Sequence, residues 1–263
     1  MAIGAADFRS MRIDLSGQTA IVTGASSGIG AHFAKVLAQH GANVAIAARR
    51  IERLEALRDE LRGIGVKAEA LALDVADHAA CKQVVLDAEA ALGTPTILLN
   101  NAGIDGARMA IKQDIAEVER VLAVNVTGVF AMAQACAQAM KTAGTGGSIV
   151  NTASILGLRQ GPTLAAYAAS KAAVIQLTKQ FALEWARYGI RVNALAPGYY
   201  PTEITEGLLD SPHGAEMVER IPMRRLGRLP DLDGPMLLLA SDAGAYMTGA
   251  VIPVDGGHLV TPL

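Results

Sequence analysis

Thr19-Ala20-Ile21-Val22-Thr23-Gly24-Ala25-Ser26-Ser27-Gly28-Ile29-Gly30 is the stretch that decides the fold of this chain. Its first half is a short apolar run without polar alternation, which is typical of a buried parallel strand. Its second half is a turn spaced Gly-x-x-x-Gly-x-Gly, and the apolar pattern from Ile29 to His40 predicts a helix directly after it. In this context glycines let the backbone approach a pyrophosphate at a helix N-terminus. The alternative is a tight turn that binds no ligand.

Strands and helices alternate along the rest of the chain. We expect strands at 19–23, 42–47, 66–73, 96–99, 148–151, 191–195 and 250–254, and helices at 29–40, 51–62, 79–92, 116–140, 164–188 and 232–240. Repeated β-α-β units imply right-handed crossovers. The sequence therefore predicts an α/β fold, a Rossmann-type doubly wound parallel sheet with helices on both faces. No linker breaks the alternation, so residues 1–263 are expected to form a single dinucleotide-binding and catalytic domain.

One region, 198–229, departs from this rhythm. It contains three prolines and the basic residues Arg224, Arg225 and Arg228. An excursion of this length is more often functional than idle, so we expect it to cover the substrate. A surface flap that only covers the core is the alternative. The arginines could meet an anionic substrate or lie on a solvated or interface surface.

Composition narrows the possible partners. Hydrophobic residues make up 51 % of the 263 residues and aromatic residues 4 %, so small aliphatic side chains must build the core. A net charge of −2 gives no reason to expect nucleic acid or an anionic membrane as a partner. No continuous apolar run reaches the roughly 18 residues of a membrane span, and 1–18 lacks a signal core, so a cytoplasmic protein is expected. Cys81 and Cys136 form no recognisable framework, and the five histidines lack metal-ligand spacing, so no metal site is expected.

The end of the second strand bears on the choice of cofactor. A dinucleotide site that holds the ribose hydroxyls of NAD needs an acidic residue at this place, whereas a nearby Arg suits the 2′-phosphate of NADP. The chain has Ala48 and then Arg49 here, which favours a phosphate. Arg49 and Arg50 can also be read as the solvated start of the next helix.

Two further sites carry candidate functional side chains. Asn100-Asn101-Ala102-Gly103 follows the fourth strand, where open parallel sheets bind ligands. Asn125 lies inside an expected helix, although Asn is a mediocre residue for a helix interior. A helix bend satisfied by water is the simpler explanation for Asn125.

Tyr167 and Lys171 lie four positions apart in a stretch rich in helix formers, so they share one helix face. A nearby ammonium group favours the phenolate and adapts a phenol to proton transfer. Ser154 ends a strand-like run upstream. Alone, a Tyr–Lys pair of this spacing is common on solvated helices.

The order of these motifs, with Asp74 after the third strand and Pro197-Gly198 after the sixth, resembles the compact, single-domain branch of the short-chain dehydrogenase/reductase family. The resemblance covers about Leu15 to Gly257. It implies that Ser154, Tyr167 and Lys171 are catalytic, with Tyr167 exchanging a proton and Lys171 lowering the pKa of Tyr167. Asn125 is implied to support a proton-relaying water. The cofactor-binding residues implied by the resemblance are Gly24, Ser26, Ser27, Gly28, Ile29, Gly30, Arg49, Asp74, Val75, Asn101, Ala102, Gly103, Tyr167, Lys171, Pro197, Gly198 and Thr202.

The family implies an NAD(P)-dependent oxidoreductase that transfers a hydride between nicotinamide and an alcohol/ketone substrate. NADP is favoured, with NAD possible, although many NADP-preferring members have a basic residue in the glycine turn where this chain has Ser27. The alternatives are an epimerase or dehydratase of the same superfamily and a non-catalytic dinucleotide sensor or scaffold.

The resemblance also implies a homotetramer in which the helices 116–140 and 164–188 pack across a two-fold axis. Small residues on these helices permit close approach between subunits. They are Ala131, Ala133, Ala135, Ala172, Ala173 and Ala182.

Overall fold

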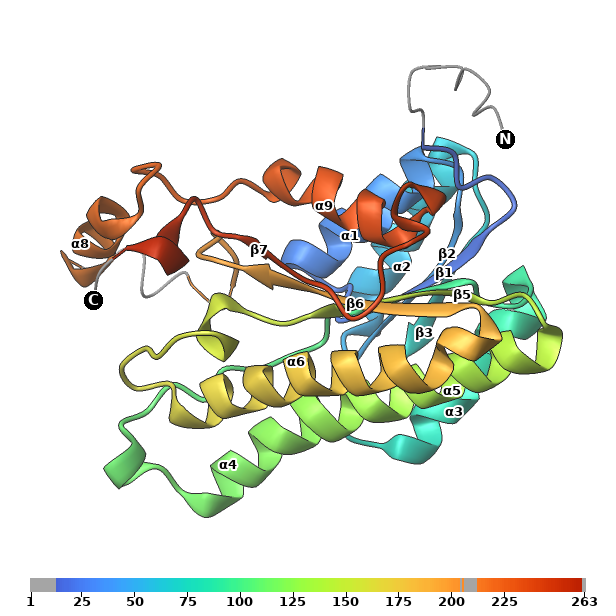
Figure 1. Ribbon diagram of the computed structural model, residues 1–263. Coiled ribbons are helices and arrows are strands. Elements are labelled where there is room, and N and C mark those ends of the chain that lie inside the picture. The colour runs from blue at the N-terminus through green and yellow to red at the C-terminus, as the bar shows by residue number, and fades with distance from the viewer. Residues whose placement is uncertain (1–12, 204, 206–211, 262–263) are drawn as a thin grey trace, which may run out of the picture.

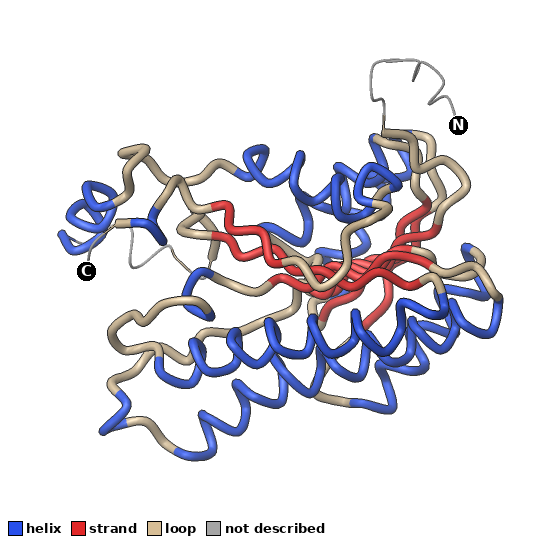
Figure 2. The backbone as a smooth tube through the Cα atoms, in the orientation of Figure 1, coloured by secondary structure: helices blue, strands red, loops and turns tan. Residues whose placement is uncertain are grey.

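The computed structural model describes residues 13–203, 205 and 212–261. Seven strands form one parallel sheet in the order β3-β2-β1-β4-β5-β6-β7. Figure 2 shows the strands as a single stack between helices. The strands are β1 Thr19–Thr23, β2 Asn43–Ala48, β3 Ala68–Ala72, β4 Ile97–Asn100, β5 Gly147–Thr152, β6 Ile190–Pro197 and β7 Val251–Val254. The predicted doubly wound α/β fold is confirmed.

Helices cover both faces of the sheet (Figure 1). One layer contains α1 Gly28–Gln39, α2 Ile51–Ile64 and α9 Asp233–Ala240. The other contains α3 His78–Leu92, α4 Ile115–Leu122, α5 Gly128–Ala143 and α6 Ala165–Trp185. In β1, Ala20 and Val22 pack into the first layer and Ile21 into the second, and all three are fully buried. Two buried faces explain why the strands read as unbroken apolar runs.

The helix predicted at 116–140 is continuous but irregular. The segment Ala123–Thr127 between α4 and α5 is a π-helix, and Asn125 lies within it. This wider turn was not predicted from the sequence. Single π turns often mark functional sites.

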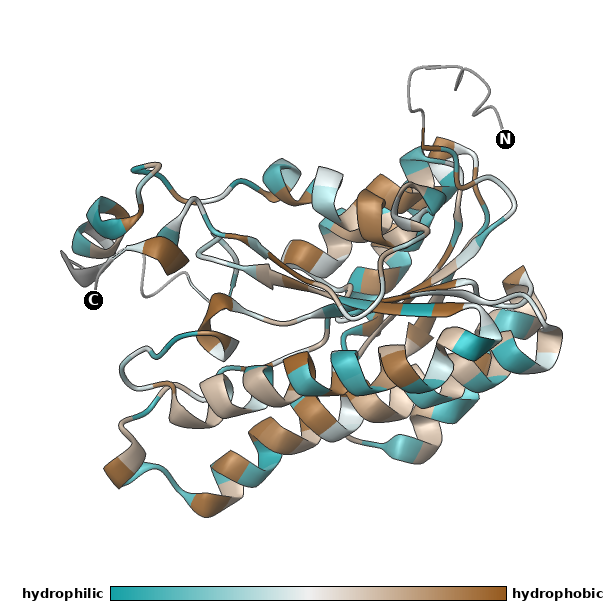
Figure 3. Ribbon diagram, in the orientation of Figure 1, coloured by the Kyte–Doolittle hydropathy of each residue, from teal (hydrophilic) through white to brown (hydrophobic). Residues whose placement is uncertain are grey.

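By length and composition alone, the run Ile115–Ala143 could cross a membrane. Figure 3 colours much of α4 and α5 as hydrophobic. In the fold, however, this run packs beside α3 and α6, and it buries Val121, Met132, Cys136 and Met140 completely. We therefore interpret it as a core helix.

The excursion at 198–229 contains a helix that the sequence pattern did not predict, α8 Pro212–Arg220, while residues 204 and 206–211 lie outside the described chain. Two of its arginines form ion pairs within the protein. Arg225 lies 2.5 Å and Arg228 3.3 Å from the carboxylate of Asp231. Arg224 donates to the carbonyl oxygen of Glu219.

Candidate active site

A cavity of about 510 Å³ opens at the carboxyl ends of the central strands. The turn after β1, the ends of β2 to β6 and the start of α6 all contribute to its wall. Every predicted cofactor-binding residue except Gly30 lines it, and so does Ser154. Asn125 and Gly30 lie behind the wall. The sheet therefore brings residues spread over most of the chain to one site. This is expected for a parallel sheet whose strand order reverses between β1 and β4.

The glycine turn has the close packing that a dinucleotide site needs. Gly24 has a φ of +66°, and a Cβ there would lie 2.7 Å from the Cα of Ala102. A Cβ at Gly30 would lie 2.4 Å from the carbonyl oxygen of Gly24. Gly30 thus allows α1 to pack under the turn rather than contacting a ligand itself. The bare backbone at the N-terminus of α1 fits a pyrophosphate.

Asn101 and Thr23 fasten this turn to the end of β4. The side-chain amide of Asn101 donates to the carbonyl oxygens of Thr23 and Gly24, each at 3.3 Å. The hydroxyl of Thr23 accepts from the backbone N–H groups of Asn101 at 3.0 Å and Ala102 at 3.2 Å. These contacts hold the small residues Ala102 and Gly103 along one side of the cavity.

The opposite ends of the cavity are built by other predicted residues. Asp74 and Val75 line it just after β3, and the Asp74 carboxylate accepts from the N–H of Ala76 at 3.1 Å. Gly198 follows β6 and crosses Asp255 so closely that a Cβ would lie 2.8 Å from the Asp255 Cα. Pro197 and Thr202 line the same end.

Tyr167 and Ser154 meet inside the cavity. Tyr167 is half-buried on the first turns of α6, and Ser154 is buried directly after β5. Burial raises the pKa of Tyr167 to about 12, although a hydrogen bond with Ser154 acts in the opposite direction. The expectation of a lowered Tyr167 pKa is therefore wrong for this structure, because desolvation of the phenol outweighs the other influences.

Lys171 extends from the next turn of α6 with only 4 % of its surface exposed. Its ammonium group donates a 2.7 Å hydrogen bond to the carbonyl oxygen of Thr152 at the end of β5. Burial lowers the pKa of Lys171 to about 8. A single neutral acceptor offsets little of the cost of burying a charge, which explains the direction of this shift.

Asn125 is completely buried and uses both ends of its side-chain amide. The oxygen accepts from the N–H of Ile104 at 2.9 Å, and the nitrogen donates to the Ile104 carbonyl oxygen at 2.8 Å and to the Ser170 hydroxyl at 3.0 Å. Asn125 thus joins the π turn to the loop after β4 and to α6. A Cβ built at Gly103 would lie 3.4 Å from the Asn125 oxygen and 3.5 Å from the Lys171 nitrogen, so these two groups are near neighbours.

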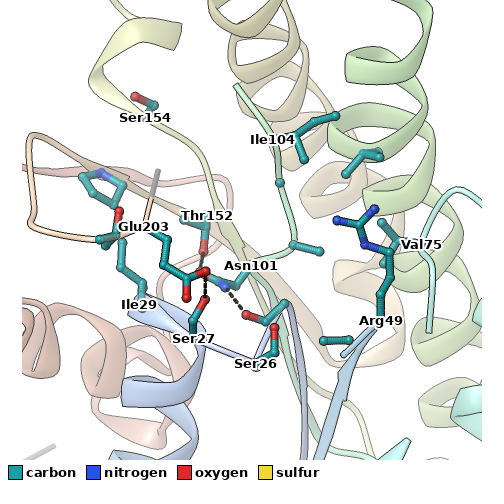
Figure 4. Close-up of a pocket in the computed structure, with 18 of the residues that line it drawn as sticks. Ser26, Ser27, Ile29, Arg49, Val75, Asn101, Ile104, Thr152, Ser154 and Glu203 are labelled. Atoms are coloured by element: carbon teal, nitrogen blue, oxygen red, sulfur yellow. Dashed lines mark hydrogen bonds between the residues drawn. The ribbon is translucent and has the colours of Figure 1, made fainter. Parts of the chain in front are cut away.

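The two arginines after β2 differ in their contacts, and Figure 4 shows Arg49 on the opposite side of the cavity from Glu203. Arg49 lies on the side of Val75, is exposed, and makes no hydrogen bond or ion pair with any residue in the described part of the chain. Arg50 turns instead to Ser26 and Ser27. Arg50, Glu203 and Arg120 also line the cavity, and sequence reasoning missed all three as site residues. For Arg50, the adjacent Arg49 was the one available signal.

Cys81 and Cys136 are both buried, and neither forms a disulfide. Among the residues that the structure describes, no group of three His, Cys, Asp or Glu side chains is arranged to hold a metal ion.

Comparison with known proteins agrees with this geometry. Residues 24–258 match a family model described as enoyl-(acyl carrier protein) reductase. The gluconate 5-dehydrogenase of Gluconobacter oxydans is 38 % identical over 248 residues, which cover 94 % of this chain and 96 % of that protein. The galactitol 2-dehydrogenase (L-tagatose-forming) of Cereibacter sphaeroides is 40 % identical over 257 residues, which cover 97 % and 99 % of the two chains.

A solved structure is similarly close. The gluconate 5-dehydrogenase from Burkholderia cenocepacia J2315, crystallised with NADP and tartrate, superposes with a TM-score of 0.92 at 37 % identity, over 95 % of this chain and 98 % of that one. The motifs, the sheet order and these similarities agree with one another. The chain belongs to the short-chain dehydrogenase/reductase family and is an NAD(P)-dependent oxidoreductase.

Proposed function

We propose that the protein interconverts an alcohol and a ketone and prefers NADP(H) to NAD(H). The observation that carries the reaction type is the convergence of Ser154, Tyr167 and Lys171 in the cavity that also contains the glycine turn. A phenol, a hydroxyl and an ammonium group at this place serve proton transfer to and from one substrate oxygen. The dinucleotide, when bound, supplies or accepts the hydride.

Tyr167 is the proposed proton donor and acceptor. With a pKa of about 12, its phenol stays protonated across the neutral range, which suits donation to a carbonyl oxygen during ketone reduction. Ser154 interacts with the phenol and is placed to hold the same substrate oxygen. Lys171 puts a positive charge beside Tyr167 whenever it is protonated, which favours the phenolate during alcohol oxidation.

The preference for NADP(H) is supported by the end of β2. Ala48 and Arg49 both line the cavity, so no carboxylate is present there to repel a 2′-phosphate, and a guanidinium group is available to bind one. The similar gluconate 5-dehydrogenase from Burkholderia cenocepacia was crystallised with NADP.

We propose sugar acids and sugar alcohols as the first substrates to test, because the similar curated proteins act on gluconate and galactitol. The experiment follows nicotinamide absorbance with a panel of polyols, sugar acids, cyclic alcohols and 3-oxoacyl thioesters, each with NADP(H) and with NAD(H). Turnover of at least one alcohol or ketone is expected, with higher kcat/KM for NADP(H). Tight dinucleotide binding without turnover of any panel member would instead favour a sensor or scaffold.

We also propose that residues 1–263 act as one domain, as a homotetramer, in the cytoplasm. A single seven-stranded sheet with two covering layers supports one domain. Two thiols that form no disulfide, Cys81 and Cys136, fit a reducing compartment. The tetramer is supported by apolar side chains exposed on α4, α5 and α6, including Ile115, Phe130 and Leu183.

A further inference from the structure

A second cationic group, the guanidinium of Arg50, lines the cavity and contacts Glu203, which Figure 4 shows on the side away from Arg49. The guanidinium of Arg50 donates to the hydroxyl of Ser26 at 3.1 and 3.2 Å and to the hydroxyl of Ser27 at 2.9 Å. Arg50 thereby lies against the turn at which Ser27 replaces a basic residue. The guanidinium comes from the start of α2, so the tertiary structure supplies a charge that the turn itself lacks.

The Arg50 guanidinium and the Ser27 hydroxyl already bind an anionic side chain of the same chain. The carboxylate of Glu203 accepts from the Ser27 hydroxyl at 3.1 Å, from Arg50 at 2.9 Å and from Arg53 at 2.5 Å. Its donors lie at least 150 residues away in sequence. These hydrogen bonds lower the pKa of Glu203 to about 2, so the group is ionised at neutral pH. The donors therefore form an anion-binding arrangement inside the wall of the cavity.

The start of α1 adds to the attraction for an anion. Ser27 occupies the N-cap position, yet its side chain makes no capping hydrogen bond, and the first turn of α1 contains no acidic residue. A helix N-terminus carries a partial positive charge that is usually balanced by a cap or an acidic side chain. Here the Ser27 hydroxyl is directed to Glu203 instead.

We propose that Arg50 and Ser27 form a second phosphate-binding group of the dinucleotide pocket, and that Glu203 occupies this group as a competing carboxylate. The inference rests on the proposed function of this cavity as the pocket for a nicotinamide dinucleotide. A phosphate carries more charge and more acceptor oxygens than a carboxylate, so it can displace Glu203 from Arg50. The side chains of Glu203 and Arg50 are 48 % and 43 % exposed, so their ion pair is weak enough to exchange.

Either of two phosphates of the cofactor can be the one that binds. The 2′-phosphate is present in NADP(H) alone, whereas the pyrophosphate is common to both dinucleotides. Comparing the two cofactors therefore identifies the source. If Arg50 binds the 2′-phosphate, removing Arg50 lowers the affinity for NADPH alone. If Arg50 binds the pyrophosphate, removing it lowers the affinities for NADPH and NADH alike.

The test is a titration of the full-length protein with NADPH and with NADH, followed by nicotinamide fluorescence without substrate. Arg50→Ala is expected to lower the affinity for NADPH about tenfold, which is typical for the loss of one charge-assisted hydrogen bond. Glu203→Gln, which keeps the side-chain shape, is expected to tighten NADPH. Arg53→Ala is the matched control, because Arg53 also binds Glu203 but does not line the cavity. It is expected not to weaken NADPH.

An unchanged NADPH affinity in Arg50→Ala would overturn the inference, and so would weaker NADPH binding by Glu203→Gln. The latter result would mean that Glu203 positions Arg50 rather than competing with the phosphate. Melting temperatures of all variants check that they fold. A wild-type protein that binds NADPH no better than NADH would refute the proposed cofactor preference. If wild type prefers NADPH but Arg50→Ala does not change the affinity for NADPH, only the present inference is refuted.

Discussion

The ammonium nitrogen of Lys171 lies 5.6 Å from the centroid of the Tyr167 ring, one helical turn along α6. Lys171 is buried and Tyr167 half-buried, and burial raises the pKa of Tyr167 to about 12 and lowers that of Lys171 to about 8. Burial thus favours a neutral phenol and a neutral amine. With a pKa of about 8, Lys171 stays mostly protonated at neutral pH, but small changes in its surroundings can shift its proton.

Tyr167→Phe removes the proposed proton donor and keeps the ring. General acid catalysis contributes about 10² to 10⁴ in rate, so kcat should fall by at least the lower factor. The affinity for NADPH should barely change, because the phenol acts on the substrate oxygen. Steady-state kinetics and fluorescence titration of the same preparation measure both. Near-normal turnover by the folded variant would rule out this role for Tyr167.

Lys171→Met should alter the pH dependence of stability. The pKa of Lys171 falls from 10.5 to about 8 on folding, so between these values the unfolded chain binds more protons and wild-type stability from this group rises with pH. Below about 8 the folded protein carries the full cost of a buried charge. The melting temperature of the variant minus that of wild type should therefore decrease from neutral to alkaline pH. A pH-independent difference would contradict the shift.

Asn125→Ala should lower the stability of the fold. The change leaves the Ile104 N–H, the Ile104 carbonyl and the Ser170 hydroxyl without their buried partner. An unsatisfied buried group costs about 1–3 kcal/mol, so the free energy of unfolding should fall by about that much or more. Urea unfolding measures the loss. Asn125→Asp, which can keep the acceptor for the Ile104 N–H, should recover part of it.

The cofactor preference should respond to the end of β2. Arg49→Ala should weaken NADP(H) selectively, because charge-assisted hydrogen bonds contribute about 1.5–3 kcal/mol each. Ala48→Asp should shift the preference toward NAD(H), since the new carboxylate repels a 2′-phosphate and can accept from ribose hydroxyls. The ratio of kcat/KM for the two cofactors on one substrate reports both changes. An NADP(H) value that is insensitive to Arg49→Ala would show that Arg49 points only to solvent.

Light scattering should give four times the chain mass of 27.2 kDa at micromolar concentration. Leu183 on α6 is 78 % exposed, and Leu183→Arg should lower the mass if this face is an interface between subunits. Ile64→Arg, at an exposed position on α2 in the opposite layer, is the control and should leave the mass unchanged. A monomer mass for wild type would refute the tetramer.

Two of the small residues assigned to that interface, Ala133 and Ala182, are instead buried in the core of the subunit itself.

Local patterns in the sequence determined the fold and most of the site. Apolar runs such as 96–99, found as β4 Ile97–Asn100, predicted the strands, and the residues directly after them fell at one edge because parallel strands end on the same side of a sheet. Tyr167 and Lys171 were recognisable because helix geometry alone brings residues four apart together. The π turn at Asn125 was not predicted, although Asn125 itself did not suit a helix interior.

Long-range geometry and solvation were decided by the tertiary structure alone. The contact between Glu203 and Arg50 joins segments 153 residues apart, and no local pattern specifies which side chains meet across a cavity. The pKa of Tyr167 moved opposite to the expectation drawn from its neighbour Lys171, because the depth of burial depends on every element packed around α6. Secondary structure follows from neighbours along the chain, whereas desolvation and cross-cavity ion pairs follow from how the whole chain excludes water.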